Sequence, residues 1–222
     1  MKTTPYIFFL ALMAIASPTL ATESSPQASL AAPRPDAAKP ALSAASQTVQ
    51  QFYAALTKAM QQGPTLGFAG RYDLLRPAIE NSFNLPSMTR FAVGPSWYKM
   101  DAAQQQELIQ SFGAFSVSSW AHRFKKFSGE QFVVAGEKQQ PDGSMIVETR
   151  LLPKDGKPVT LNYLMRKNAQ GAWQIHDVYL DAAISELASR RAEFSSILRT
   201  KGTTGLIETL HQKITTLRKT SA

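Results

Sequence analysis

The side chains that could do chemistry in this chain are few, and they lie far apart in the sequence. There is no cysteine, so a thiol nucleophile, a disulfide framework and a lipid-modified N-terminal cysteine are all excluded. The three histidines (His122, His176 and His211) fall on different expected elements without the spacing of metal ligands. The motifs of nucleophile elbows, zinc proteases, phosphate loops and dinucleotide-binding folds do not occur. We therefore predict no metal site and no cofactor.

Asp177 is the best candidate for a catalytic group. Strand alternation puts it on the same face as Trp173, Ile175 and Tyr179, so an inward face would surround its carboxylate with apolar side chains. Burial raises the pKa of a carboxyl group and can fit it for proton transfer. A cone-shaped α+β isomerase or hydratase acting on a small apolar substrate would use such a group.

Arg191 offers a simpler role for Asp177. It falls on the apolar stripe of the helix that follows, which is formed by Ile184, Leu187, Phe194 and Leu198. A buried arginine needs a carboxylate or an anionic ligand group beside it. We favour an Asp177–Arg191 pair that clamps the strand to the helix; the alternative is that Arg191 meets the headgroup of a lipid.

The N-terminus has the features of an export signal. The apolar run 7–16 is too short to span a bilayer, which needs about 20 apolar residues, so a membrane anchor is the less favoured alternative. Thr19-Leu20-Ala21 has small residues where a signal peptidase reads them, which predicts a signal peptide, 1–21, cut after Ala21. Residues 22–45 are rich in Ala, Pro and Ser and predict a flexible leader. Residues 46–222 have a suitable length for one domain.

The chain carries a formal charge of +8, which favours acidic partners. No basic run with interleaved aromatics is present, and an exported chain would not meet nucleic acid, so we predict none. Anionic lipid surfaces or acidic docking sites on proteins fit better. The alternative is a basic, solvated surface without a specific partner.

Hydrophobic periodicity predicts helices, then a run of strands, then helices again. The first helices are expected at 46–60, at 71–83, just after Leu85-Pro86, and from an Asp101–Gln104 capping box to about Phe127. Strands are expected at 130–138, 144–152, 159–167 and 172–180, and two closing helices at 183–199 and 204–218. This order predicts an α+β fold: a curved antiparallel meander sheet of about four strands, wrapped by N-terminal and C-terminal helices around an apolar pocket.

The long helix after Asp101 is apolar over an unusually wide arc. Two groups of apolar residues lie about a quarter turn apart: Leu108, Ile109, Phe112 and Phe115, and then Val117, Trp120, Phe124 and Phe127. Either the helix kinks near Gly113, or it is contacted on two sides, by the sheet and another part of the chain or by other helices.

Several ordered motifs resemble the MlaC family of periplasmic lipid-binding proteins, also called the toluene-tolerance auxiliary family, and most closely its hopanoid-associated HpnM branch. The matching residues are spread over about 46–218. They are Arg71-Tyr72-Asp73, Asn84-Leu85-Pro86, Met88-Thr89-Arg90, Ala92-Val93-Gly94-Pro95-Ser96-Trp97, Val159 with Leu161-Asn162-Tyr163-Leu164, Asp177-Val178-Tyr179-Leu180-Asp181, Ile184-Ser185-Glu186-Leu187-Ala188, Arg190-Arg191, Glu193-Phe194, Leu198-Arg199 with Gly202, and Gly205-Leu206-Ile207. Two positions depart from the family: Arg190 stands where an aromatic is common, and Glu186 where the wider family tends to be apolar.

The resemblance implies a non-enzymatic periplasmic carrier that shuttles a hopanoid or a phospholipid between the inner and outer membranes. It implies an inner-membrane transporter and an outer-membrane complex as partners, and we expect a monomer. The expected pocket lining is apolar and aromatic: Trp97, Phe112, Phe115, Trp120, Val147, Leu161, Tyr163, Met165, Ile175 and Tyr179. Asp177 and Arg191 form the expected clamp or headgroup contact. A module that docks on a membrane complex without binding lipid is a further alternative.

Overall fold

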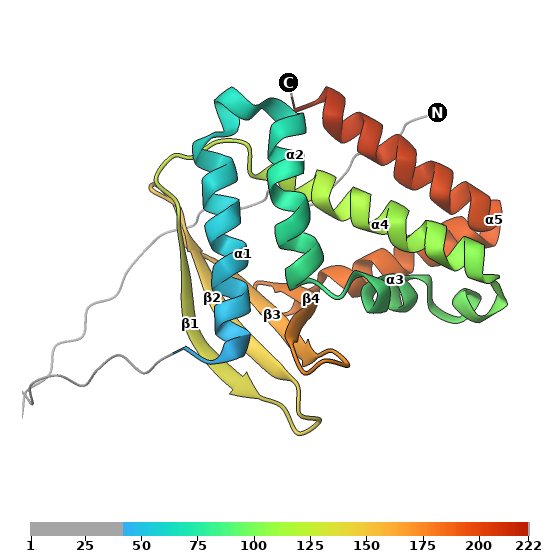
Figure 1. Cartoon of the computed structure of the whole chain (residues 1–222), viewed down its shortest axis with the longest axis horizontal. Helices are drawn as coiled ribbons and strands as arrows, with labels where there is room; N and C mark the ends of the chain where they lie inside the picture. The colour runs from blue at the N-terminus through green and yellow to red at the C-terminus, as the bar shows by residue number, and fades with distance from the viewer. Residues whose placement is uncertain (1–41, 222) are drawn as a thin grey trace, which may run out of the picture. The chain divides into compact units, whose positions relative to one another are not determined.

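Residues 42–221 are described by a computed structural model of the chain, shown in Figure 1. The predicted signal peptide and all but the last residues of the predicted leader lie outside the described residues. The helices before the sheet are α1 (Ala44–Gln61), α2 (Gly63–Ser82), α3 (Leu85–Val93), the 3₁₀ helix η1 (Gly94–Lys99) and α4 (Ala102–Arg123). The strands are β1 (Gln131–Gln139), β2 (Met145–Leu152), β3 (Val159–Lys167), β4 (Trp173–Leu180) and β5 (Ile184–Ser185), and α5 (Glu186–Lys219) follows.

The predicted α+β fold with an antiparallel meander is confirmed, because the five strands pair in chain order. The expected helices and four long strands are present, and the Asp101–Gln104 capping box opens α4 as predicted. Two boundaries were wrong, and one strand was missed. α2 already begins at Gly63, α4 ends at Arg123 rather than near Phe127, and the two-residue strand β5 was not expected.

One face of the sheet is covered by α1 (Figure 1). Phe52 and Leu56 of α1 are fully buried, and Tyr53 stacks on Phe132 of β1 with ring centroids 4.6 Å apart. The Tyr53 hydroxyl lies 2.6 Å from the Thr149 hydroxyl of β2, within hydrogen-bond distance. On the sheet side this core contains Val147, Tyr163, Met165 and Ile175, all with no exposed area. The burial of these apolar surfaces is the main source of the stability of this layer.

A β-bulge in β4 changes which side chains share a face. Tyr163 is opposite Val178, and Met165 is opposite Ile175, so His176 is left as the extra residue. Val178 and Ile175 therefore both face α1. Asp177, which is opposite Leu164, is turned to the other face of the sheet. The expectation that Asp177 and Tyr179 share a face with Ile175 was wrong, because regular alternation allows for no inserted residue.

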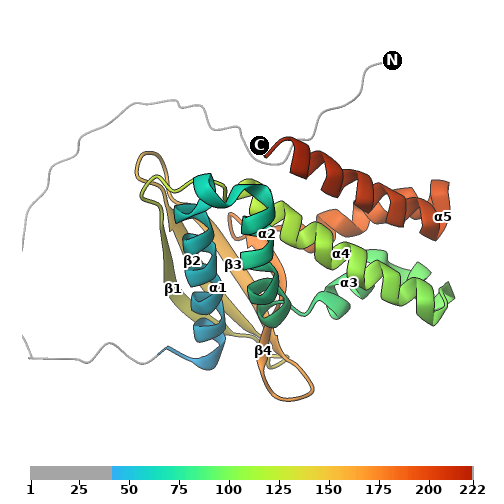
Figure 2. The ribbon, with the colours of Figure 1, turned by 45° about the horizontal axis from the view of Figure 1, so that its top comes forward.

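The remaining helices form a layer beside the sheet, where α4 is contacted by α2, α3 and α5 (Figure 2). α4 continues through Gly113 without a break, so other helices, and not a kink, account for its wide apolar arc. Gly202 interrupts α5 with a φ of +66°, and the second half of α5 folds back along α4. This break agrees with the two closing helices predicted from the sequence. Among the described residues, no helix is long and apolar enough to cross a membrane.

We predict that stability falls when the pH is lowered from 8 to 5. Burial lowers the pKa of His122, whose Nδ1 lies 2.6 Å from the Ser221 hydroxyl, and of His176 in the bulge. In the unfolded chain these imidazoles become protonated near pH 6.5, whereas in the folded protein they become protonated only at lower pH. The contribution of the two neutral histidines to the free energy of unfolding is therefore fully present above about pH 6.5. It is lost as the pH falls through their lowered pKa values in the folded protein.

Urea unfolding at the two pH values measures this effect. The double variant His122→Gln/His176→Gln should flatten the pH dependence of the free energy of unfolding. If the free energy of unfolding of the double variant still falls as steeply when the pH is lowered, other titratable groups cause the pH dependence.

Candidate ligand-binding site

A pocket of about 730 Å³ opens between α2, α4 and the turn that joins β3 to β4. This volume lies within the range of about 300–1,000 Å³ that is usual for small-molecule sites. The lining residues come from four segments: Tyr72, Arg76 and Glu80; Phe83, Asn84, Leu85 and Pro86; Ile109, Gln110, Gly113, Ala114 and Val117; and Asn168, Ala169, Gln170 and Gln174. Apolar groups and polar groups therefore both line it.

The junction between α2 and α3 fixes one side of this pocket to the sheet. The Asn84 amide donates to the Ile175 carbonyl at 2.9 Å, and Phe83 forms an isolated parallel bridge with Ile175. The Asn84 side-chain amide donates to the Gln174 side-chain oxygen at 3.0 Å. Since Asn84 also caps α3 by accepting from the Ser87 amide, one residue positions both the helix and the strand at the pocket.

Small residues on α4 create the space. Gly113 and Ala114 lie between Ile109 and Val117 on the pocket side of the helix. A Cβ atom on Gly113 would lie 3.4 Å from a methyl carbon of Leu85, so the glycine lets α4 approach the start of α3 closely. Side chains of ordinary size at these two positions would occupy the pocket.

None of the ten residues expected to line a pocket lies in this one. Val147, Tyr163, Met165 and Ile175 are in the core beneath α1, and Phe112 and Phe115 are buried on α4 on the side of α5. Trp97 of η1 is also buried, whereas Trp120 and Leu161 are partly buried against the core and Tyr179 is half-buried on the other face of the sheet. Their role as ligand contacts stays a prediction.

The expected ion pair between Asp177 and Arg191 is not one of the ion pairs within residues 42–221. One Asp177 carboxylate oxygen accepts from the Val178 amide at 2.8 Å and from the Leu187 amide at 3.0 Å. The other accepts from the Ser185 hydroxyl at 2.5 Å, and this hydroxyl in turn caps α5 by accepting from the Ala188 amide. The carboxylate therefore joins β4 to the N-terminus of α5, where the helix dipole favours negative charge.

These contacts explain why Asp177 can be buried without a cation. Burial raises the pKa of its carboxyl group, and the three donated hydrogen bonds oppose that rise in part. Arg191 instead lies over the ring of Phe91 on α3, with its guanidinium carbon 5.1 Å from the ring centroid. The expected clamp was wrong because the bulge turns Asp177 toward backbone donors.

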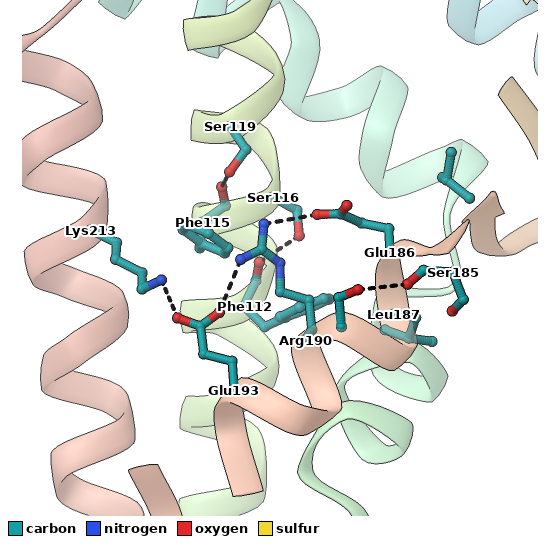
Figure 3. A network of polar contacts seen from close by, with 12 residues as sticks. Phe112, Phe115, Ser116, Ser119, Ser185, Glu186, Leu187, Arg190, Glu193 and Lys213 are labelled. Carbon is teal, nitrogen blue, oxygen red and sulfur yellow. Dashed lines mark hydrogen bonds and ion pairs between the residues drawn. The ribbon is translucent and has the colours of Figure 1, made fainter. Parts of the chain in front are cut away.

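The two positions that depart from the family lie in one ionic network, shown in Figure 3. Arg190 donates to Glu186 at 2.8 Å and to Glu193 at 3.1 Å, and Lys213 pairs with the other oxygen of Glu193. The Arg190 guanidinium lies over the ring of Phe115 on α4, 4.9 Å from its centroid. The network thus links both halves of α5 to α4. The spacings i,i+3 and i,i+4 could have indicated the first two pairs.

Residues 47–212 match the MlaC protein family. The chain belongs to this family. The match spans nearly all of the described residues and confirms the family that the sequence motifs indicated.

The MlaC-family fold is also seen in a solved structure. A phospholipid-binding protein from Ralstonia solanacearum, determined in complex with a phospholipid, aligns with a TM-score of 0.68 at 18% sequence identity. The alignment covers 78% of this chain and 98% of that one, so the two share the whole fold. Among the described residues of this MlaC-family protein, no cluster of acidic, histidine or cysteine side chains could hold a metal ion.

We predict that Asp177→Ala destabilises the protein by about 2 kcal/mol, because it leaves buried donors of β4 and α5 without an acceptor. Asp177→Asn should cost less than about 1 kcal/mol, since its amide oxygen can still accept from both backbone amides. Denaturant unfolding measures both. Asp155→Ala, at an exposed turn, is the matched control and should be neutral. Equal, small effects of Asp177→Ala and Asp155→Ala would contradict the capping role.

Proposed function

We propose that this protein is a lipid-binding carrier and that the apolar part of its ligand enters the pocket between α2, α4 and the β3–β4 turn. The pocket volume of about 730 Å³ carries this proposal, because a space of this size can take up a lipid chain. Phe83, Leu85, Ile109 and Val117 supply apolar surface for the chain. Arg76 and the side-chain amides nearby supply polar contacts for a headgroup.

The physical task of such a carrier needs no catalytic group. Exposing one methylene group to water costs about 0.8 kcal/mol, so a sixteen-carbon chain in water costs on the order of 12 kcal/mol. A dry apolar surface removes most of this cost during transfer. The alternative of an isomerase or hydratase is not favoured, because the Asp177 carboxylate is occupied by the donors of α5 and lies outside the pocket.

A phospholipid is the ligand class that we propose to test first, because the structural relative is a phospholipid-binding protein. A hopanoid is the second, because the sequence most resembles the hopanoid-associated branch. Both present a large apolar body to the pocket and a small polar group to its rim.

Membership of the MlaC family supports a place in the periplasm for the mature protein. We propose export with cleavage after Ala21, a leader at 22–45 and a single domain at 46–222. We further propose that the monomeric carrier exchanges lipid with an inner-membrane transporter and an outer-membrane complex.

We predict that Ala114→Trp lowers lipid binding at least about tenfold, because the indole fills the pocket and removes apolar contact area of the ligand. Mass spectrometry of organic extracts, together with uptake of labelled phospholipid from vesicles, measures the loss. Ala54→Trp, on the exposed side of α1, is the matched control and should bind normally.

Tyr163→Trp separates this pocket from the lining expected in the core. Tyr163 has no exposed area, so the larger ring should lower stability by about 1–3 kcal/mol without changing the pocket. Lipid binding that survives Ala114→Trp but is lost in a folded Tyr163→Trp would place the ligand beneath α1 instead. Protein that never retains or takes up lipid would reject the carrier function.

A further inference from the structure

Four segments that are distant in the sequence meet at one end of the helices. Gly63, at the start of α2, lies so close to the loop after α4 that a Cβ atom there would be 2.2 Å from the Lys125 carbonyl oxygen. The other two segments are the β2–β3 loop and the C-terminal end of α5. In Figure 1 the C-terminal end of α5 lies beside the upper end of α2, and the loop after α4 runs past the upper ends of α1 and α2 toward the β2–β3 loop.

Side-chain contacts confirm this arrangement. The side chain of Lys154 in the β2–β3 loop lies within 4 Å of the position of a Cβ on Gly129, in the loop after α4. His122, near the end of α4, and Ser221 are hydrogen-bonded across 2.6 Å. Arg218 of α5 lies over the ring of Phe68 of α2, 6.0 Å from its centroid. The loops and helix ends therefore form one continuous surface.

This surface is strongly basic, and we call it the basic end. Its cations are Lys58, Lys125, Lys126, Lys154, Lys157, Arg218 and Lys219, and its acids are Glu130 and Asp155. Seven cations less two anions leave a local charge of +5. All but two of these nine side chains, Lys125 and Glu130, are exposed.

A buried arginine adds to this charge from beneath. Arg71 is 3% exposed and donates to the Ala121 carbonyl at 2.9 Å and the Gly63 carbonyl at 3.0 Å. No carboxylate of the described residues lies within ion-pair distance of it. The charge of Arg71 is therefore balanced by carbonyl dipoles alone, and its field extends to the basic end.

Phe127 gives the basic end an apolar tip. It is 40% exposed in the loop after α4 and follows Lys125 and Lys126 directly. An aromatic ring next to lysines is suited to the boundary between headgroups and acyl chains, where the ring enters the apolar side and the cations meet phosphates.

We propose that the basic end docks the protein on an anionic lipid bilayer. Six of its seven cations are lysines, and they are spread over several segments, which suits a diffuse layer of headgroup charge rather than one shaped protein partner. The exposed Phe127 also favours a bilayer over an acidic protein surface, because its ring can enter the apolar side of the headgroup boundary. None of these nine charged side chains lines the pocket, and the proposal does not depend on lipid entering it.

Co-sedimentation with phosphatidylglycerol and phosphatidylcholine vesicles tests the proposal. Binding to the anionic vesicles should be strong at low salt and should weaken as ions screen the charges. Each lysine near an anionic surface contributes about fivefold in affinity, so Lys125→Glu/Lys126→Glu should lower binding by about 25-fold or more. Phe127→Ala should lower it by a smaller factor that salt does not change.

The matched controls lie elsewhere on the helices. Arg199→Glu/Lys201→Glu makes the same charge change near the Gly202 break, and Tyr98→Ala removes an aromatic ring that is 76% exposed on η1. Both should bind anionic vesicles like the unchanged protein. The proposal fails if either control loses binding as strongly as its partner variant, or if neutral and anionic vesicles bind equally.

Two further measurements separate a bilayer from an acidic protein as the partner, and docking from lipid uptake. Vesicles that do not bind at low salt, while an immobilised polyglutamate surface does, would assign the basic end to an acidic protein. Ala114→Trp should dock on anionic vesicles normally while failing to take up lipid. Loss of docking therefore counts against the basic end, and loss of uptake alone counts against the proposed pocket.

Discussion

The carboxylate of Asp177 is the interaction on which the relation between sheet and helices depends. It accepts from two backbone amides and from the Ser185 hydroxyl, and so fixes the point where β4 becomes α5. α5 then packs along α4, and α4 forms one side of the pocket. A buried charge can serve in this way because the amides at the helix start replace the water that burial removes.

The elements were predictable because their signals are local. The capping box at Asp101 and Gln104 placed the start of α4, and turn residues separated the strands correctly. The faces of β4 were not predictable, because the extra residue His176 leaves no mark on the hydrophobic pattern. A single inserted residue moved Asp177 and Tyr179 across the sheet, and Asp177 binds Ser185 and two backbone amides instead of Arg191.

The pocket was harder to predict than the fold for a physical reason. Large apolar residues such as Tyr163 and Met165 are equally suited to a solid core and to a ligand cavity, and here they fill the core. Space arises where side chains are small, at Gly113 and Ala114, and where segment ends meet around it. Those ends, such as Asn84 and Gln174, are far apart in the sequence, and only the register of β4 brings them together.

The cover that α1 provides for the sheet has a consequence for how the chain acquires its structure. The apolar side of α1 is buried against strands made about a hundred residues later, as the contact between Tyr53 and Thr149 illustrates. Thr48 donates to the Trp173 carbonyl across 125 positions. Closing such long loops costs entropy before burial returns it, so folding should be slow. An incomplete chain has no sheet on which α1 can rest, so we expect the buried face of α1 to be covered only after the strands have been made.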